Sequence, residues 1–425
     1  MKTAVRLGLA LLFAGSMLFY VQAILVPYQE RDAEIHDRPR GNLSDLYPRW
    51  LGARELLLHG RDPYSHEVTR EIQIGYYGRT LDPTRPEDPK DEVRFAYPVF
   101  VTFLLAPTVG LPFDFVQTAF LWLLVLLTAA SVLLWLDFLR WRPSGAGVLF
   151  AVLLTVGSFP VVQGVKLQQL SLLVGFLLAL SAALLVRGRL FISGTVMAIA
   201  MIKPQLVIPV AGWLLIWTIS NWRRRRTWAL GFGLTLLVLL AASEWLLPGW
   251  ITRFRDATIA YRAYASGISL LDTLLSPIVG KLVTALLILV VFVLCWRFRK
   301  FSESQSEFQR STALVLTATV VIVPMIAPYN QILLLPSLLF VARLWPRLSS
   351  QSRLTRALSI AACGLIAWPW LATTALTLLS VITPAEQVQR AWTVPLFSSL
   401  FIPLLVVALQ LVAFETQEQK KPDSA

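Results

Sequence analysis

Charged residues are scarce in this sequence. Asp, Glu, Lys and Arg make up 15% of its 425 residues, whereas about one quarter is usual for a soluble domain. Hydrophobic residues reach 56%, the mean hydropathy is +0.64, and the apolar residues stand in long blocks. A water-soluble core does not need this much apolar sequence. The composition therefore argues against a soluble domain and predicts a helical protein that crosses a membrane several times.

Cysteine and histidine are scarce as well. Cys295 and Cys363 both lie inside apolar blocks, where we expect small buried side chains rather than disulfide partners or thiolate ligands. His36 and His59 share one polar segment that contains no cysteine, which argues against a transition-metal site. No cofactor and no bound metal are expected, although a hard divalent cation held by carboxylates and a phosphate stays open.

Acidic residues are outnumbered by basic ones, 25 against 38, which gives a net charge of +13. The basic residues form short clusters between apolar blocks, which is typical of cytoplasmic loops and not of a nucleic-acid-binding surface. Placing every cluster in the cytoplasm predicts about twelve spans with both termini inside. The clusters are Lys2 with Arg6, Arg140 with Arg142, Arg187 with Arg189, and those within 223–226, 297–300, 343–356 and 420–421.

The apolar blocks predict an all-α architecture. We expect a first transmembrane helix over 1–26, an extracytoplasmic loop over 27–95, a transmembrane helical core over 96–414 and a cytoplasmic tail over 415–425. The first block is long and lacks a convincing cleavage site, so it is expected to be a retained span. A short membrane-embedded piece is expected near 98–110, and further blocks lie near 114–136, 146–161, 170–186, 190–203, 204–220, 228–247, 277–296, 311–327, 331–345, 357–380 and 396–414.

The polar loop contains a predicted short helix. Ser44 is a candidate N-cap, and Gly60 stands just past the expected end. Trp50, Ala53 and Leu57 recur at spacings of three and four, so they share one face. This pattern predicts an amphipathic helix suited to the membrane surface.

Several motifs follow one another in a recognisable order. In the polar loop they are Asp45-Leu46, Trp50, Gly52-Ala53-Arg54, Leu57-Leu58 and Gly60-Arg61-Asp62-Pro63-Tyr64. Later pieces are Phe95-Ala96-Tyr97-Pro98, Leu105-Ala106-Pro107, Leu111-Pro112, the loop from Gln163-Gly164-Val165 to Leu170, and Arg187-Gly188-Arg189 followed by Gly194 and Ile202-Lys203-Pro204. Together they resemble glycosyltransferase family 87, of the GT-C superfamily, over most of residues 1–340.

The resemblance implies a multi-pass protein of the bacterial plasma membrane with an extracytoplasmic active site. It implies inverting transfer of a hexose, with mannose the first choice, from a polyprenyl-phosphate carrier to a lipid or glycan acceptor. The family's base is an aspartate in the first outer loop, and Asp45 is the matching position. A carboxylate in hydrogen-bond reach can take the proton of an acceptor hydroxyl as it attacks the anomeric carbon. Without the resemblance, Asp32, Asp37 and Asp62 compete for this role, and Asp45 is alternatively a helix-capping residue.

Lys203 is the first candidate for substrate binding. It stands at the junction of two apolar blocks, where an unpaired ammonium is costly, so it should face a cavity or a partner. It could bind the carrier phosphate or extend to the lipid headgroups. Lys166, Gln163 and Gln169 belong to a polar cluster in a short outer loop, which could contact the sugar or phosphate or be solvated.

The remaining substrate-binding candidates lie at the predicted outer side. Arg94 and Tyr97 could contact a phosphate or anchor the chain at the interface. Asp62 and Tyr64 belong to the opening signature and also fit a turn. Asn330 lies in a short outer turn of the core.

Two other functions compete with a glycosyltransferase. A transporter or lipid flippase explains many spans equally well, but its binding sites usually lie near the membrane midplane, which leaves the long polar loop without a role. A ligase that moves a whole glycan from a lipid pyrophosphate is the other alternative. The donor preference separates these possibilities.

Overall fold

The computed structural model describes residues 3–264, 269–324, 326–348 and 353–418. Helices dominate these ranges, and no strand occurs in them, so the all-α prediction is confirmed there. The helices are α1 (Thr3–Phe19), η1 (Tyr20–Leu25), α2 (Val26–Ile35), α3 (Tyr47–His59), α4 (His66–Tyr77), α5 (Val101–Leu105), η2 (Ala106–Thr108), α6 (Phe113–Phe138), α7 (Gly145–Val156), α8 (Phe159–Lys166), α9 (Leu170–Val186), α10 (Leu190–Ala200), α11 (Pro204–Ile219), α12 (Trp222–Leu246), α13 (Trp250–Tyr264), α14 (Leu270–Leu274), α15 (Pro277–Phe298), α16 (Ser306–Ile322), η3 (Pro328–Leu334), α17 (Leu335–Leu348), α18 (Arg353–Leu379), α19 (Ala385–Arg390), α20 (Thr393–Leu400) and α21 (Ile402–Glu418).

Six helical segments within the described ranges are long and apolar enough to cross a membrane. They are Thr3–Ile35, Phe113–Phe138, Trp222–Leu246, Pro277–Phe298, Arg356–Leu379 and Glu386–Leu411. A seventh is possible if α7 and α8, which are bent by 56° at their junction, form one broken span. The predicted count of about twelve is therefore not confirmed, because α9, α10 and α11 are apolar but only 11 to 17 residues long.

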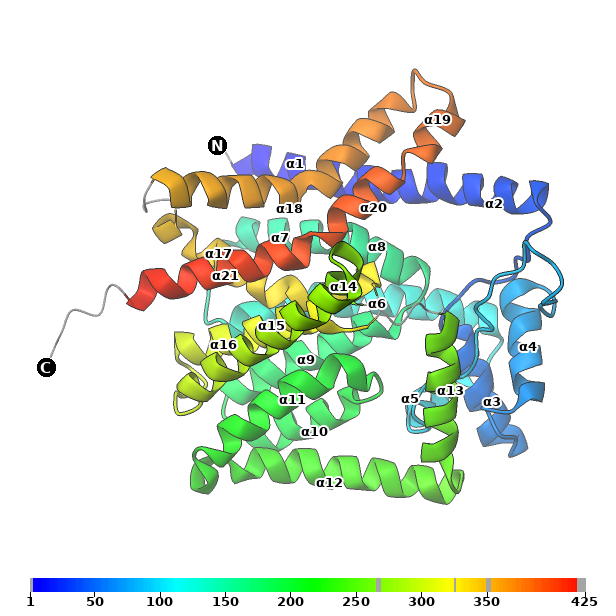
Figure 1. Ribbon diagram of the computed structural model, residues 1–425, viewed down its shortest axis with the longest axis horizontal. Coiled ribbons are helices and arrows are strands. Elements are labelled where there is room, and N and C mark those ends of the chain that lie inside the picture. Colours follow the sequence, from blue (N-terminus) through cyan, green and yellow to red (C-terminus); the bar gives the residue numbers. More distant parts are fainter. Residues whose placement is uncertain (1–2, 265–268, 325, 349–352, 419–425) are drawn as a thin grey trace, which may run out of the picture.

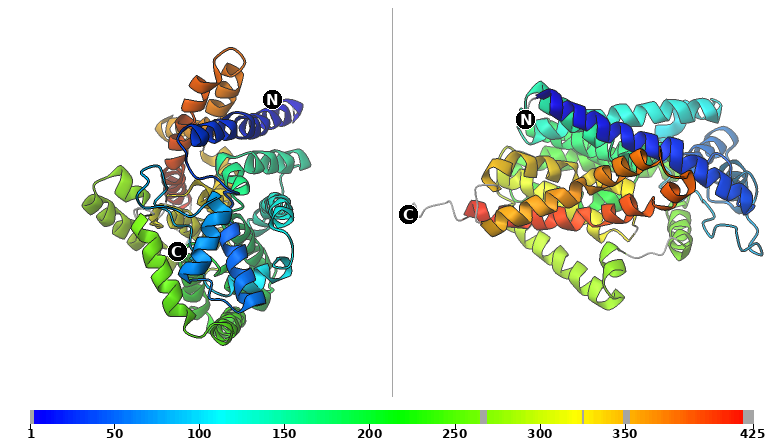
Figure 2. Two further views of the ribbon diagram at one scale, coloured as in Figure 1. Left: turned by 90° about the vertical axis from the view of Figure 1, so that its right-hand side faces the viewer. Right: turned by 90° about the horizontal axis from the view of Figure 1, so that it is seen from above.

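Several predicted blocks coincide closely with helices. The block at 170–186 is α9, and the block at 114–136 is α6. The piece predicted near 98–110 is short, as expected, and consists of α5 and η2. The first helix continues without a break from Thr3 to Ile35, well past the expected end at residue 26. It packs against α7 and α18, which come from distant parts of the chain (Figure 2).

The bundle has two different ends. In Figure 1, α1, α12 and α21 run roughly along the long axis, and α1 begins at the same end at which α21 finishes. At the other end, α4 and α13 stand across that direction. The cytoplasmic placement of both termini stays a prediction, and the final residues of the predicted tail, 419–425, lie outside the described ranges.

Several basic residues join helix ends at the end of the bundle where α1 begins. Arg187 pairs with Asp137 across 2.7 Å, which links the ends of α9 and α6. Arg225 is only 3% exposed and donates hydrogen bonds to the carbonyl oxygens of Arg299 and Phe301, both at 2.9 Å. Carbonyl oxygens at helix ends are poorly satisfied within a helix, so cations stabilise them.

Helix α3 is packed inside the protein rather than on a membrane surface. Trp50 is 4% exposed, Ala53 is fully buried, and the Trp50 ring lies 5.1 Å from that of Phe113. The predicted membrane-surface role is therefore wrong for this face, because the rest of the chain already covers it. The helix ends as predicted, since Gly60 adopts a φ of 65°, which costs glycine little. Ser44 does not cap it; the first residue before the helix is Leu46.

Candidate active site

Asp45 is fixed between three segments at the end of the bundle that carries α4 and α13. Its backbone N–H donates to the Leu167 carbonyl oxygen at 2.9 Å, which ties the N-terminal side of α3 to the loop after α8. Its carboxylate accepts a hydrogen bond from the Tyr76 hydroxyl at 3.1 Å and a short one from the Gln169 side-chain amide. A carboxylate offers about four lone-pair positions, so two remain for another donor.

Gln169 connects Asp45 to Lys203. While its amide nitrogen donates to Asp45, its side-chain oxygen accepts from Lys203 Nζ at 3.1 Å. Lys203 also donates to Ser171 Oγ at 2.5 Å, and this hydroxyl donates to Asn330 Oδ1 at 2.8 Å. One continuous hydrogen-bonded network thus joins the polar segment around Asp45 and Tyr76, the start of α9, the α10–α11 junction and η3.

Lys203 occupies an unusual place for a cation. It is 4% exposed and directly precedes α11, whose first residue is Pro204. The N-terminus of a helix carries partial positive charge, so it favours anions and disfavours an ammonium group. Within the described residues Lys203 makes no ion pair, and its hydrogen-bond partners Gln169 and Ser171 are neutral. Such a site is electrostatically suited to an anion.

Tyrosine side chains surround these groups. The guanidinium carbon of Arg49 lies 4.4 Å from the centre of the Tyr97 ring, and Lys203 Nζ lies 5.0 Å from that of Tyr329. Burial, assisted by the Asp45 carboxylate, raises the pKa of the Tyr76 phenol well above its ordinary value. Burial also raises the pKa of Tyr261, on α13, to about 12. Tyr76 and Tyr261 are therefore neutral near pH 7, and Tyr76 donates its proton to the hydrogen bond with Asp45.

The structure brings only some of the predicted site residues together. Asp45, Gln169, Lys203 and Asn330 belong to the network described above, and Tyr97 lies beside it through Arg49. Tyr64 contributes indirectly, because its hydroxyl donates to the Tyr97 carbonyl oxygen at 2.6 Å.

Four predicted residues have other surroundings. Lys166 donates to the Gln29 side chain at 2.9 Å, toward α2, and Arg94 pairs with Glu92. Asp62 forms the predicted turn by accepting from the Tyr64 N–H at 2.9 Å, and it also pairs with Arg253 of α13 at 3.1 Å. The side-chain oxygen of Gln163 is buried and has no hydrogen-bond partner among the described residues. These four residues do not join the Asp45 network.

Three residues of the site were not predicted from the sequence: Tyr76, Arg49 and Ser171. For Tyr76 a signal exists in the Gly75-Tyr76-Tyr77-Gly78 segment. The Gly41 and Leu43 N–H groups donate to the Tyr76 carbonyl oxygen, which holds this segment against residues 41–43, just before Asp45. A Cβ on Gly41 would lie 2.4 Å from the Gly75 oxygen. Glycine is thus required for the close approach that places the Tyr76 phenol.

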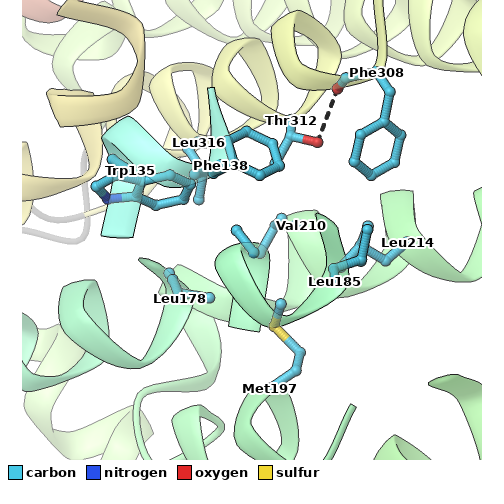
Figure 3. Close-up of a pocket in the computed structure, with 11 residues that line it drawn as sticks. Trp135, Phe138, Leu178, Leu185, Met197, Val210, Leu214, Phe308, Thr312 and Leu316 are labelled. Carbon is cyan, nitrogen blue, oxygen red and sulfur yellow. Dashed lines mark hydrogen bonds between the residues drawn. The ribbon is translucent and has the colours of Figure 1, made fainter. Parts of the chain in front are cut away.

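An apolar cavity elsewhere in the bundle differs from this site in character. It lies between α6, α9, α10, α11 and α16, and Figure 3 shows its lining. Thr312 and the indole of Trp135 supply the polar side-chain atoms there, and the Thr312 hydroxyl is already used, donating to the Phe308 carbonyl oxygen at 3.0 Å and accepting from Trp213. The cavity therefore offers little to a sugar or a phosphate. In the part of the chain that the structure describes, no three His, Cys, Asp or Glu side chains gather as metal ligands.

Comparison with known families identifies the class of protein. The profile of glycosyltransferase family 87 matches residues 95–328, which is more than half of the chain. This chain belongs to glycosyltransferase family 87, and its apolar helices make it a membrane glycosyltransferase. The matched region includes Gln169 and Lys203, whereas Asp45 and the motifs around it up to Tyr64 precede it. No curated protein and no solved structure matches the chain.

Proposed function

We propose that this protein transfers a hexose, mannose in the first instance, from a polyprenyl-phosphate carrier to a hydroxyl of a lipid or glycan acceptor. The observation that carries the proposal is the connection of Asp45 to Lys203 through Gln169. It places a carboxylate one side chain away from a buried ammonium group at a helix N-terminus. Acceptor activation and leaving-group stabilisation need these two groups side by side.

Asp45 acts as the base in this proposal. The acceptor hydroxyl donates to a free lone pair of the carboxylate, which takes the proton as the oxygen attacks the anomeric carbon. The bond between that carbon and the phosphate oxygen breaks on the opposite face, and the phosphate leaves with the electron pair. Transfer therefore inverts the anomeric configuration. Tyr76 and Gln169 hold the carboxylate in place, which favours reaction by orientation.

Lys203 binds the carrier phosphate. The leaving phosphate gains negative charge in the transition state, and a fixed cation in a site with little water stabilises that charge strongly. The N-terminus of α11 adds partial positive charge in the same place. Both contributions exist before substrate arrives, so little reorganisation is needed.

The active site faces the extracytoplasmic side in this proposal. Arg187 and Arg225 lie at the opposite end of the helices that begin near Asp45, and basic residues favour the cytoplasmic side. We also propose that the short helices α9, α10 and α11 are enclosed crossings of a GT-C-like core, since most of α9 is buried by other helices.

The test uses purified protein in liposomes with a radiolabelled polyprenyl-phosphate mannose and candidate lipid or glycan acceptors. Asp45→Asn should leave only a small residual rate of transfer, because the amide cannot accept the acceptor proton. Asp37→Asn is the matched control: it removes one carboxylate from the same polar segment, at an exposed position with a positive φ of 47° that asparagine tolerates. Transfer by Asp45→Asn at the wild-type rate would overturn the base assignment.

A second set of donors tests the reaction itself. Polyprenyl-phosphate glucose tests the choice of sugar, and a glycan on polyprenyl pyrophosphate tests the ligase alternative. If the wild-type protein moves a labelled lipid across the bilayer without forming a glycoside, the chain is a flippase and the proposed transfer is wrong.

A further inference from the structure

Arg49 is a second cation at the candidate site. It lies in the first turn of α3, and its Nη1 donates to the Asp45 carbonyl oxygen at 2.5 Å. Its guanidinium stacks on Tyr97, while its Nε is buried and has no hydrogen-bond partner among the described residues. A buried donor without a partner is rare in a folded protein, because its lost hydration is not replaced.

The geometry of the guanidinium defines which side is available. Arg49 Nη1 is used by the Asp45 carbonyl oxygen, and the ring of Tyr97 covers one face of the plane. The edge formed by Nε and Nη2 remains. Two parallel N–H groups on one edge of an arginine can donate to two oxygens of the same phosphate or carboxylate. The ammonium group of a lysine cannot make this paired contact.

The electrostatics of the pair also call for an anion. Arg49 and Lys203 are both tied to Asp45: Arg49 donates to its carbonyl oxygen, and Lys203 is linked to its carboxylate through Gln169. Neither cation makes an ion pair in the described part of the chain. Two neighbouring cations with reduced access to water repel each other, and a bound anion between them removes that repulsion.

We infer that Arg49 and Lys203 together bind the non-bridging oxygens of a lipid-linked phosphate, with the Nε edge of Arg49 making a paired contact and Lys203 a point contact. This inference rests on the proposed function for the identity of the ligand, because it assigns the phosphate of the carrier to this position. Arg49 also holds the Asp45 backbone through Nη1, so the phosphate and the base are kept at a set separation by one side chain.

Binding of two lipids that differ only in the phosphate tests the inference without requiring turnover. The purified full-length protein is titrated with polyprenyl phosphate and with the uncharged polyprenol of the same length, and tryptophan fluorescence reports binding. Arg49→Gln should weaken binding of polyprenyl phosphate about 10- to 100-fold, the usual effect of losing a hydrogen bond between charged groups, and should leave polyprenol binding unchanged. Arg49→Lys should recover part of the affinity, because it restores the charge but not the paired contact.

Arg70→Gln is the control, since it removes the same charge from an exposed position on α4. Equal weakening of both lipids by Arg49→Gln would indicate a structural role and overturn the inference, as would unchanged binding of polyprenyl phosphate. The result is independent of transfer: if the wild-type protein binds polyprenyl phosphate through Arg49 but makes no glycoside, the phosphate site stands and the proposed reaction fails. If the wild-type protein transfers the sugar and Arg49→Gln binds polyprenyl phosphate and reacts like wild type, the proposed reaction stands and the role of Arg49 in binding the phosphate is wrong.

Discussion

Replacing Gln169 with leucine separates the two ionic groups of the candidate site without removing either. Leucine has a similar size but cannot donate to Asp45 or accept from Lys203. Asp45 keeps its hydrogen bond from Tyr76, and Lys203 keeps the one to Ser171, so neither is left without a partner. A hydrogen bond to a charged group contributes about 1.5–3 kcal/mol. We therefore expect kcat to fall about 10- to 100-fold through poorer orientation of the base.

A double-mutant cycle shows whether this loss passes through Asp45. Transfer of radiolabelled sugar is measured under single-turnover conditions for wild type, Gln169→Leu, Asp45→Asn and the double variant. If Gln169 acts by orienting the carboxylate, Gln169→Leu should lower the rate less than about twofold once Asp45 is already an amide, because residues that act as a unit are not additive. Gln387→Leu, at an exposed position of α19, controls for the chemical change.

The reasoning fails if the two losses are additive. The full effect of Gln169→Leu in the Asp45→Asn background would mean that Gln169 contacts the substrate directly or supports the fold, and that its hydrogen bond to Asp45 has no catalytic value. An unchanged elution volume in detergent distinguishes direct contact from misfolding.

Two further predictions concern charge. Lys203→Met should abolish measurable transfer and leave the melting temperature unchanged or higher. Methionine has a similar volume, and the change removes a buried ammonium that has no ion pair among the described residues. Transfer assays and thermal unfolding in detergent check this prediction, and a large loss of stability would contradict it. Although burial acts in the opposite direction, the hydrogen bonds from Arg79 and from the Asp82 backbone lower the pKa of Asp88. A lowered pKa in the folded state stabilises the protein above the unfolded-state pKa, and this stability is lost as the pH falls through the folded-state pKa. Proteolysis of the 79–91 segment should therefore rise below about pH 4 in wild type, and Asp88→Asn should flatten that pH dependence; identical profiles would refute it.

The helical architecture follows largely from the sequence. Long apolar runs must satisfy their backbone groups internally in a membrane, so α6 and α9 appear within a residue or two of the predicted blocks. The helix at 47–59 was also predicted, because Gly60 marks its end regardless of context. These features depend on local composition and backbone geometry, which the sequence contains directly.

Tertiary packing decided which candidates form a site. The sequence makes both Lys166 and Lys203 candidates for substrate binding, yet Lys166 turns toward Gln29 and Lys203 toward Gln169. It also treats the apolar face of α3 as a membrane surface, although the chain itself covers that face. The contacts between Asp45, Tyr76 and Gln169 join segments 31 and 124 residues apart. Hydrophobic periodicity predicts which face of a helix is buried, but not which other segment of the chain or which solvent covers that face. These neighbours are therefore determined only in the folded chain.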